Sequence, residues 1–345
     1  MKLVPTRDLQ DISNQLSGIS ESFQRKRILI TGSSGFIGSW LSQSLSSLSA
    51  EFNLDLELIF VSRRIDDSFR NSIVRLGNKN NVFIESNLSS KNLSEFECLE
   101  NLNLVFHTAT TVTKLEPQIS NLDMKFATAS TSNLINLISV SKEPPVLIHL
   151  SSGAVYGPHS SNPKLLSESS ERGEVQNLSS YGQIKQQIED LVIAASDSGL
   201  VIGSNPRLFS FFGPLLSLNT HFAIGNFVGN AINGRDIELT GNPNSSRSYL
   251  YIADLIRKLI LLSHKPTSDT IHLGSRNLIN MAELATSVKK VINDKIDIKL
   301  PNTDIPSNHY VPSVEKSNLY LDDYSEISIP EGLLEWKNWL LQKQF

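Results

Sequence analysis

The sequence predicts a doubly wound α/β fold, in which helices cover both faces of a parallel sheet. Two observations support this class. Short apolar runs rich in Val, Ile, Leu and Phe alternate with longer amphipathic stretches, and the short runs are continuously apolar. Continuous apolar strands are typical of parallel sheets that are buried on both faces. After about residue 213 the elements become shorter and richer in Gly and Asn, which predicts a smaller mixed α/β cap.

Local pattern and breaker residues place the elements of the larger part of the chain. Helices are expected where apolar residues recur at helical spacing, and strands where β-branched and aromatic residues cluster. Pro144 and Pro145 end the third helix because proline cannot continue a helical hydrogen-bond ladder. The expected helices are 35–48, 65–76, 121–142 and the helix that carries Tyr181; the expected strands are 27–31, 56–62, 81–86, 104–109, 146–152 and 200–209.

Composition excludes several classes of protein. The chain has 345 residues, of which 39% are hydrophobic and 19% charged, with a net charge of −4. These values describe a globular protein with no electrostatic attraction for nucleic acid or an anionic membrane. The single cysteine, Cys98, allows no intramolecular disulfide, and no apolar run is long enough to span a membrane. A cytoplasmic location is therefore expected, and the seven scattered histidines predict no metal site.

The segment TGSSGFIG, residues 31–38, follows the first predicted strand and opens a helix. Its three glycines, Gly32, Gly35 and Gly38, permit a tight turn and let the backbone approach a pyrophosphate at the helix N-terminus. This placement predicts a dinucleotide-binding loop. The alternative is a tight strand-to-helix connection without a ligand.

The end of the second strand bears on which dinucleotide binds. An acidic residue there would hold the ribose 2′-hydroxyl of NAD, whereas arginine would accept the 2′-phosphate of NADP. The chain has Ser62, Arg63 and Arg64 at this place, and guanidinium groups suit a phosphate monoester. NADP is therefore favoured over NAD, and the alternative is that both arginines belong to a solvated loop.

Two further segments carry groups suited to proton transfer. HLSSGAVYG, residues 149–157, follows a strand, so it lies at the carboxyl edge of the sheet, where ligands bind in this architecture. A serine there can orient a substrate oxygen, although Ser and Gly also favour plain turns. Tyr181 and Lys185 stand four residues apart on one helical face, where an ammonium group would lower the pKa of the phenol.

The segments TGSSGFIG, LSSGAVYG and Tyr181-x-x-x-Lys185, in this order, resemble the extended short-chain dehydrogenase/reductase family. The sequence is most similar to its nucleotide-sugar epimerase/dehydratase branch. PRLFSFFGP (206–214), RSYLYIADL (247–255), IHLGS (271–275) and NMAELA (280–285) add to the resemblance, which covers roughly residues 26 to 320.

The resemblance implies a Rossmann domain, a substrate-binding cap and a homodimer. The implied dinucleotide-binding domain is 26–212, and 236–275 partly returns to it. The implied cap consists of 213–235 and 276–345. Residues 1–25 form a leader, either a helix packed on the main domain or a tail. The helices over 121–142 and 180–197 would form the homodimer interface.

The resemblance also assigns roles to individual residues. Tyr181 would be the acid/base, Lys185 would bind the nicotinamide ribose and lower the tyrosine pKa, and Ser152 would position the sugar oxygen. Arg247 would bind the nucleotide diphosphate, or alternatively form a surface salt bridge. The implied cofactor-binding residues are Gly32, Ser34, Gly35, Phe36, Ile37, Gly38, Ser62, Arg63, Arg64, Asn87, Leu88, Thr108, Ala109 and Lys185. The implied substrate-binding residues are Ser152, Ser210, His221, Asn226 and Arg247.

Some positions depart from the pattern of this branch. Its dehydratases place an Asp-Glu pair after the serine or threonine, and its decarboxylases keep a carboxylate there, whereas this chain has Gly153 and Ala154. Ala127 and Ser210 stand where asparagines are usual, and Asn87 where an aspartate often holds the adenine. In the cap, His221 and Asn226 are expected on an apolar helix facing the nucleotide, with a purely structural histidine as the alternative.

The predicted function is oxidoreduction at C4 of a nucleotide-diphosphate sugar with NADP or NAD. Two reactions fit, 4-epimerisation and reduction of a 4-keto sugar. The segment SSGAVYG favours epimerisation, and the arginines at the end of strand 56–62 favour reduction. The alternatives are a 4,6-dehydratase or decarboxylase with an atypical acid, and a catalytically silent NAD(P)-binding protein.

Overall fold

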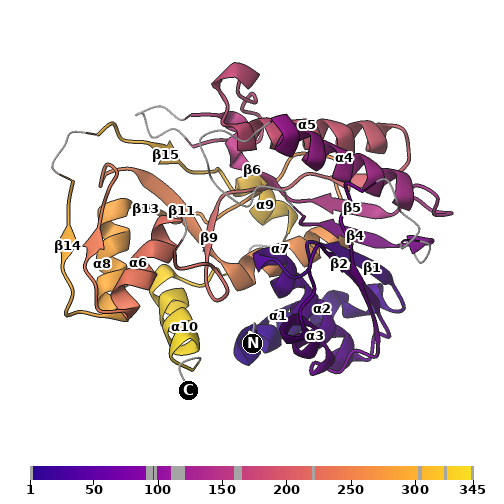
Figure 1. Cartoon of the computed structure of the whole chain (residues 1–345), viewed down its shortest axis with the longest axis horizontal. Coiled ribbons are helices and arrows are strands. Elements are labelled where there is room, and N and C mark those ends of the chain that lie inside the picture. Colours follow the sequence, from indigo (N-terminus) through magenta and orange to yellow (C-terminus); the bar gives the residue numbers. More distant parts are fainter. Residues whose placement is uncertain are drawn as a thin grey trace. The chain divides into compact units, whose positions relative to one another are not determined.

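The computed structural model describes residues 3–90, 96, 99–109, 121–158, 165–219, 222–301, 305–321 and 325–342. The chain divides into two compact units, each of which is described by itself (Figure 1). Unit 1 consists of Met1–Gly157, Gly173–Arg207 and Ile256–Ile271, and unit 2 of Pro158–Arg172, Leu208–Leu255 and His272–Phe345. The roles assigned to a dinucleotide domain and a cap stay predictions.

Unit 1 is built on a six-stranded, entirely parallel sheet in the order β3-β2-β1-β4-β5-β7. The predicted doubly wound α/β class is therefore confirmed. The strand order reverses between β1 and β4, and the carboxyl ends of the strands beside such a reversal form the ligand-binding crevice of these folds. The strands are β1 (Arg27–Thr31), β2 (Glu57–Ser62), β3 (Asn80–Glu85), β4 (Leu104–His107), β5 (Val146–His149) and β7 (Ile202–Ser204).

Helices cover this sheet. The α-helices of unit 1 are α1 (Thr6–Gln15), α2 (Phe36–Phe52), α3 (Asp67–Val74), α4 (Asn121–Ile138) and α5 (Ser180–Asp197), and the 3-10 helices are η1 (Ser17–Phe23), η3 (Gly153–Tyr156) and η4 (Val175–Asn177). Helices α4 and α5 lie side by side (Figure 1). They bury residues such as Leu134, Ile184 and Val192 with Leu29 and Val105 of the sheet. This apolar layer fixes α5, the helix that carries Tyr181.

The described part of the leader, residues 3–25, is mostly helical and packs on α2. Leu9, Ile12 and Leu16 are buried, as their helical spacing requires, and the Val4 N–H donates to Gln43 Oε1 at 3.0 Å. Helix α2 therefore packs against α1 as well as against β1 and β2, which explains its mostly apolar and small residues.

Two expected strands are each divided in two, which corrects the prediction for 146–152 and 200–209. Pro206 has no N–H to continue a ladder, so β7 ends at Ser204 and β8 (Arg207–Leu208) follows as a separate strand. On the neighbouring segment, the Ser151 N–H donates to the Pro206 carbonyl at 2.9 Å instead of pairing in the main sheet. β5 accordingly ends at His149, and β6 is confined to Ser151–Ser152.

Unit 2 is a smaller mixed α/β unit centred on β11 (Ser246–Tyr251). This strand pairs in parallel with β9 (Ser210–Phe212) and β15 (His309–Tyr310), and antiparallel with β13 (Leu278–Asn280). The remaining elements are β10 (Ile237–Glu238), β12 (His272–Leu273), β14 (Ile298–Lys299), α6 (Ala223–Ile232), α8 (Met281–Ile292), α9 (Glu315–Tyr320) and α10 (Ile329–Gln342). Helix α7 (Ile252–His264) begins in unit 2 and ends in unit 1.

Among the described residues, none of the helices has both the length and the apolar character needed to cross a bilayer.

The β1–α2 turn is held by close backbone packing, which gives a first prediction. A Cβ atom at Gly38 would lie 2.1 Å from the Gly32 carbonyl oxygen, so Gly38→Ala requires the backbone to move. We expect this substitution to lower the free energy of unfolding by about 1–3 kcal/mol, measured by urea denaturation. Gly18→Ala is the control, because an added Cβ there has no atom within 4 Å. Equal stability of both variants would contradict the packing described.

Candidate active site

The glycine segment forms the turn between β1 and α2. Gly32 has a left-handed backbone, with φ of +67°, and a Cβ atom there would lie 2.8 Å from the Ala109 nitrogen. Gly35 is the N-cap of α2 and offers no side chain to cap its first turn. Helix N-termini attract phosphate through their N–H groups. The turn therefore has the close backbone approach and the uncapped helix start that fit a dinucleotide pyrophosphate.

Ser62 ties the end of β2 to this turn. Its hydroxyl oxygen accepts the Ser34 N–H at 3.1 Å and lies 3.2 Å from the Ser33 hydroxyl, while the Ser34 hydroxyl donates to the Arg64 carbonyl at 2.9 Å. Arg63 and Arg64 are exposed at the same strand end. Ser62 thus has a structural task, and the cationic side chains next to it are accessible to an anionic ligand.

The other expected cofactor residues lie at the ends of β3 and β4 and in the first turn of α2. Thr108 and Ala109 contact Gly32, and the Thr108 hydroxyl donates to the Thr31 carbonyl at 2.7 Å. Asn87 is exposed, and its Oδ1 accepts the Ser89 N–H and hydroxyl at 3.2 and 2.9 Å. Leu88 is buried, whereas Phe36 and Ile37 are partly exposed.

Tyr181, Ser152 and Lys185 come together beyond the carboxyl end of β5. The Tyr181 phenol is hydrogen-bonded to the Ser152 side chain. The Ser152 hydroxyl also accepts the Ala154 N–H at 3.2 Å, so its oxygen is held by η3. Lys185, one turn further along α5, places its Nζ 5.7 Å from the centre of the Tyr181 ring and donates to the Leu150 carbonyl. The three expected catalytic residues therefore form one cluster.

The pKa of Tyr181 departs from the expectation. Burial raises the pKa of the Tyr181 phenol above its usual 10, and the hydrogen bond with Ser152 only partly opposes this. The predicted lowering by Lys185 is thus wrong for this arrangement. The reason is geometric: the ammonium group faces the tyrosine ring and donates to a backbone carbonyl.

Lys185 itself is strongly perturbed. Burial lowers the pKa of its ammonium group from 10.5 to about 8, although the Glu189 carboxylate opposes the shift. Burial and the charge of Lys185 together also keep two histidines neutral: the pKa of His107 is lowered to about 3, and that of His149 is lowered well below 6.5. Lys185 is therefore the group of this cluster that titrates near neutral pH.

Hydrogen bonds fix the tautomers of both histidines. The Asn205 amide donates to the Glu189 carbonyl at 3.4 Å, so its Oδ1 faces His149 Nδ1 at 2.8 Å and accepts its proton. For His107, the Thr131 hydroxyl is already a donor to Ala127, so it accepts from Nε2 at 3.1 Å. Both rings are thereby held as neutral structural groups behind Lys185.

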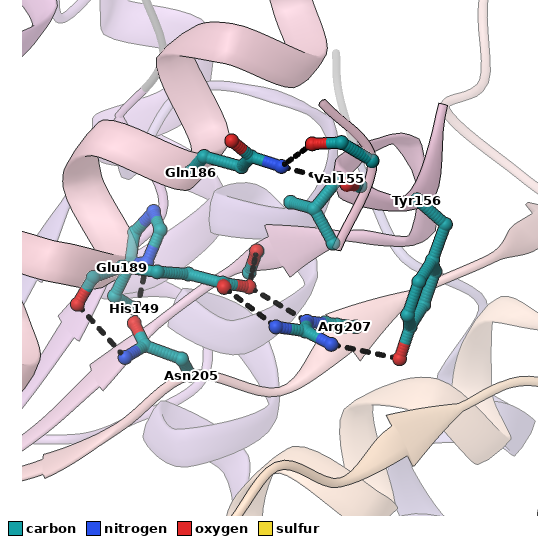
Figure 2. Close-up of polar contacts among 9 residues, drawn as sticks. His149, Val155, Tyr156, Gln186, Glu189, Asn205 and Arg207 are labelled. Atoms are coloured by element: carbon teal, nitrogen blue, oxygen red, sulfur yellow. Dashed lines mark hydrogen bonds and ion pairs between the residues drawn. The ribbon is translucent and has the colours of Figure 1, made fainter. Parts of the chain in front are cut away.

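Sequence reasoning missed a buried polar network behind this cluster (Figure 2). Arg207 and Glu189 form two hydrogen bonds, Nε to Oε1 at 2.9 Å and Nη2 to Oε2 at 2.8 Å. Ser151 donates to Glu189 Oε1 at 2.5 Å, and Arg207 Nη1 donates to the Tyr156 hydroxyl at 2.7 Å. One signal was present in the sequence, because Glu189 stands four residues after Lys185 and so on the same helical face.

Gly153 and Ala154 occupy the start of η3, directly after Ser152. A Cβ atom at Gly182 of α5 would lie 2.5 Å from the Ala154 carbonyl oxygen, so the helix and this segment pack with backbone in contact. Neither Gly153 nor Ala154 carries a group that could move a proton.

Apart from Ser152, which lies in unit 1, the expected substrate residues belong to unit 2. Ser210 lies on β9 and Asn226 on α6, both partly exposed. Arg247, on β11, donates through Nη1 to the Ser246 and Asn308 carbonyls at 2.8 and 2.9 Å, and its guanidinium lies 5.9 Å from the Tyr310 ring centre. His221 lies outside the described residues, and α6 begins after it at Ala223. Their roles toward a substrate stay predictions.

The fold and the glycine turn define a Rossmann-type dinucleotide-binding protein. A family model described as the NAD dependent epimerase/dehydratase family matches residues 28–274. The chain therefore belongs to this family, which confirms the resemblance drawn from its motifs.

Individual relatives catalyse different reactions on nucleotide sugars. UDP-glucuronic acid decarboxylase 1 of Xenopus tropicalis is 24% identical over 315 residues, 90% of this chain and 70% of that protein. The UDP-glucuronic acid 4-epimerase of Bacillus cereus, solved with UDP-glucuronic acid and NAD, aligns with a TM-score of 0.74 at 18% identity, covering 92% of this chain and 99% of that one. The dTDP-glucose 4,6-dehydratase of Bacillus anthracis, solved with NAD, aligns with a TM-score of 0.75 at 17% identity, covering 92% and 97%.

The lowered pKa of Lys185 predicts a pH dependence of stability. Between about pH 8 and 10.5 the unfolded chain keeps a proton on this lysine that the folded chain has lost, so this group makes the free energy of unfolding rise with pH. Lys185→Met removes the group. From pH 7.5 to 9.5 we expect the wild type to gain roughly 1–2 kcal/mol relative to this variant, because a difference of one bound proton changes the free energy of unfolding by about 1.4 kcal/mol for each pH step of one.

Urea denaturation of both proteins at the two pH values measures this difference, and the shared titrations of other groups cancel. A constant difference between wild type and Lys185→Met would show that Lys185 titrates with an ordinary pKa.

Proposed function

We propose that this protein acts as an epimerase or ketoreductase at C4 of a nucleotide-diphosphate sugar, with Tyr181 as the acid/base. The observation that carries the proposal is the hydrogen bond between Tyr181 and Ser152, with Lys185 beside the tyrosine ring. The two residues that follow Ser152 are Gly153 and Ala154, so no carboxylate stands there. Such a set can move one proton to or from a sugar hydroxyl, and offers no second acid.

Each residue of the cluster has a separate task in this proposal. The Ser152 hydroxyl orients the sugar oxygen toward Tyr181 and shares its hydrogen bond. Tyr181 takes up or returns the proton of that oxygen. Lys185 would bind the nicotinamide ribose of the cofactor through its ammonium group, which has three N–H donors when charged. NAD(P) bound at the glycine turn would supply the hydride chemistry.

A decarboxylase is the second candidate, because the curated relatives at 24% identity include UDP-glucuronic acid decarboxylases. Decarboxylation or dehydration by this chain would need an atypical acid, since the positions after Ser152 are Gly153 and Ala154. A catalytically silent NAD(P)-binding protein is the third candidate, and the preserved cluster of Ser152, Tyr181 and Lys185 argues against it.

We propose NADP as the preferred cofactor. Arg63 and Arg64 are exposed after β2, and Ser62 replaces the carboxylate that would hold an unphosphorylated ribose. The family description and the neighbouring structures name NAD, so this preference is the point at which the chain would differ from them.

Product analysis with Tyr181→Phe tests the reaction. We expect the wild type to convert UDP-glucuronic acid in the presence of NAD(P)⁺ to its C4 epimer, or to oxidise NADPH with a nucleotide 4-keto sugar. Tyr181→Phe should reduce turnover at least about 100-fold, the typical contribution of general acid–base catalysis, and leave cofactor affinity nearly unchanged. Products are followed by NMR and the dissociation constant by fluorescence titration.

Tyr320→Phe, the same chemical change on α9, is the control and should keep full activity. Release of CO₂ and a nucleotide pentose would establish the decarboxylase instead. Full activity of Tyr181→Phe would refute the assigned acid/base, and binding of NAD(P) with no turnover of any nucleotide sugar would favour the silent protein.

Arg63→Ala tests the cofactor preference. If the Arg63 guanidinium pairs with the 2′-phosphate, its removal should weaken NADP binding about tenfold or more, in line with a charge-assisted hydrogen bond of about 1.5–3 kcal/mol, and change NAD binding little. Arg75→Ala, an exposed arginine at the end of α3, is the matched control. An equal loss of affinity for NAD and NADP in Arg63→Ala would refute the assignment of Arg63 to the 2′-phosphate.

A further inference from the structure

Glu189 is a buried carboxylate on the helix that carries Tyr181 and Lys185. It is 1% exposed and follows them by two turns and one turn of α5. Its two oxygens accept three hydrogen bonds, one from Ser151 and two from Arg207. Hydrogen bonds from this many donors hold the carboxylate in one orientation.

The partners of Glu189 connect it to the segment that presents Ser152. Ser151 is the residue directly before Ser152, and Arg207 continues to the Tyr156 hydroxyl at the other end of η3. Gln186, on the same helix, adds hydrogen bonds of 2.9 Å to the Val155 and Gly173 carbonyls (Figure 2). These contacts fix the position of α5 along the Ser151–Tyr156 segment. They therefore also fix the distance between the Tyr181 and Ser152 side chains.

We propose that Glu189 is a positioning residue of the Tyr181–Ser152–Lys185 site. It anchors α5 to the serine segment through Ser151 and Arg207, and it supplies the negative charge that keeps the buried Lys185 protonated. The catalytic consequence rests on the proposed function. The effect on the protonation of Lys185 does not, and can be measured without turnover.

Of the charged and titratable groups that the structure describes around Lys185, Glu189 is the one that stabilises its positive charge. On α5 the neighbours are Tyr181 and Glu189 itself; His107 on β4 and His149 on β5 face it as neutral rings. Lys125 on the adjacent α4 is exposed. Among the described groups, the Glu189 carboxylate is the one whose charge raises the pKa of Lys185. Removing that charge therefore favours the neutral amine.

Three variants separate this role from that of an ordinary ion pair. Glu189→Gln keeps the shape and removes the charge, but leaves Arg207 buried without a counter-charge and could fail to fold. The double variant Glu189→Gln with Arg207→Met removes both charges and avoids that cost. Asp190→Asn is the matched control, an exposed acid at the next position of α5.

The first readout is the titration midpoint of Lys185, followed by NMR in ¹³C-lysine-labelled protein and assigned by its loss in Lys185→Met. We expect the midpoint to fall by about one pH unit in Glu189→Gln and in the double variant, which is a tenfold change in proton affinity. It should stay unchanged in Asp190→Asn. The double variant decides the question if Glu189→Gln does not fold.

The second readout is activity on the nucleotide sugar as a function of pH. The alkaline limb of kcat should move down with the Lys185 midpoint, so that activity falls about tenfold above pH 8 and much less at pH 6.5, with KM little changed. An unmoved midpoint with only a lower melting temperature would overturn the proposal and leave Glu189 as a structural ion pair. A moved midpoint without any activity in the wild type would instead count against the proposed function alone.

Discussion

The contact between α5 and the Ser151–Tyr156 segment is the constraint on which the candidate site depends. Tyr181 and Lys185 lie on the helix, and Ser152 lies at the strand end. The three side chains meet only if α5 is fixed in position relative to the Ser151–Tyr156 segment. The buried ion pair of Glu189 and Arg207 fixes this position through hydrogen bonds, and the contact between Gly182 and Ala154 fixes it through close packing. Breaking such a pair from one side costs about 3–5 kcal/mol, which keeps the arrangement rigid.

Burial explains the electrostatics of the same cluster. Desolvation of the Tyr181 phenol raises its pKa, and burial of Lys185 lowers the pKa of its ammonium group to about 8. Two neutral histidines and one carboxylate surround the lysine. A proton-transfer site of this kind is tuned as much by the residues behind it as by the residues that would touch a substrate.

The glycine turn and the sheet class could be predicted because each depends on local sequence, whereas the cluster of Ser152, Tyr181 and Lys185 was predicted through the family resemblance. Gly32 and Gly38 are required where the backbone has no room for a side chain, and the Tyr181–Lys185 spacing follows from the helical period. The breaks at Leu150 and Pro206 were missed, since an apolar run does not show where a strand changes its partner. The pKa of Tyr181 was predicted in the wrong direction, because spacing on a helix does not reveal where an ammonium group points.

The sequence by itself determined the doubly wound fold, the membership of the NAD dependent epimerase/dehydratase family and the residue types at the site, since these follow from short motifs and apolar periodicity. Only the tertiary structure decided that Glu189 and Arg207 meet behind Lys185 and that Ser62 is bound to the glycine turn. Such pairs join segments far apart in the chain. Their geometry and protonation depend on packing and on the exclusion of water, which no single segment encodes.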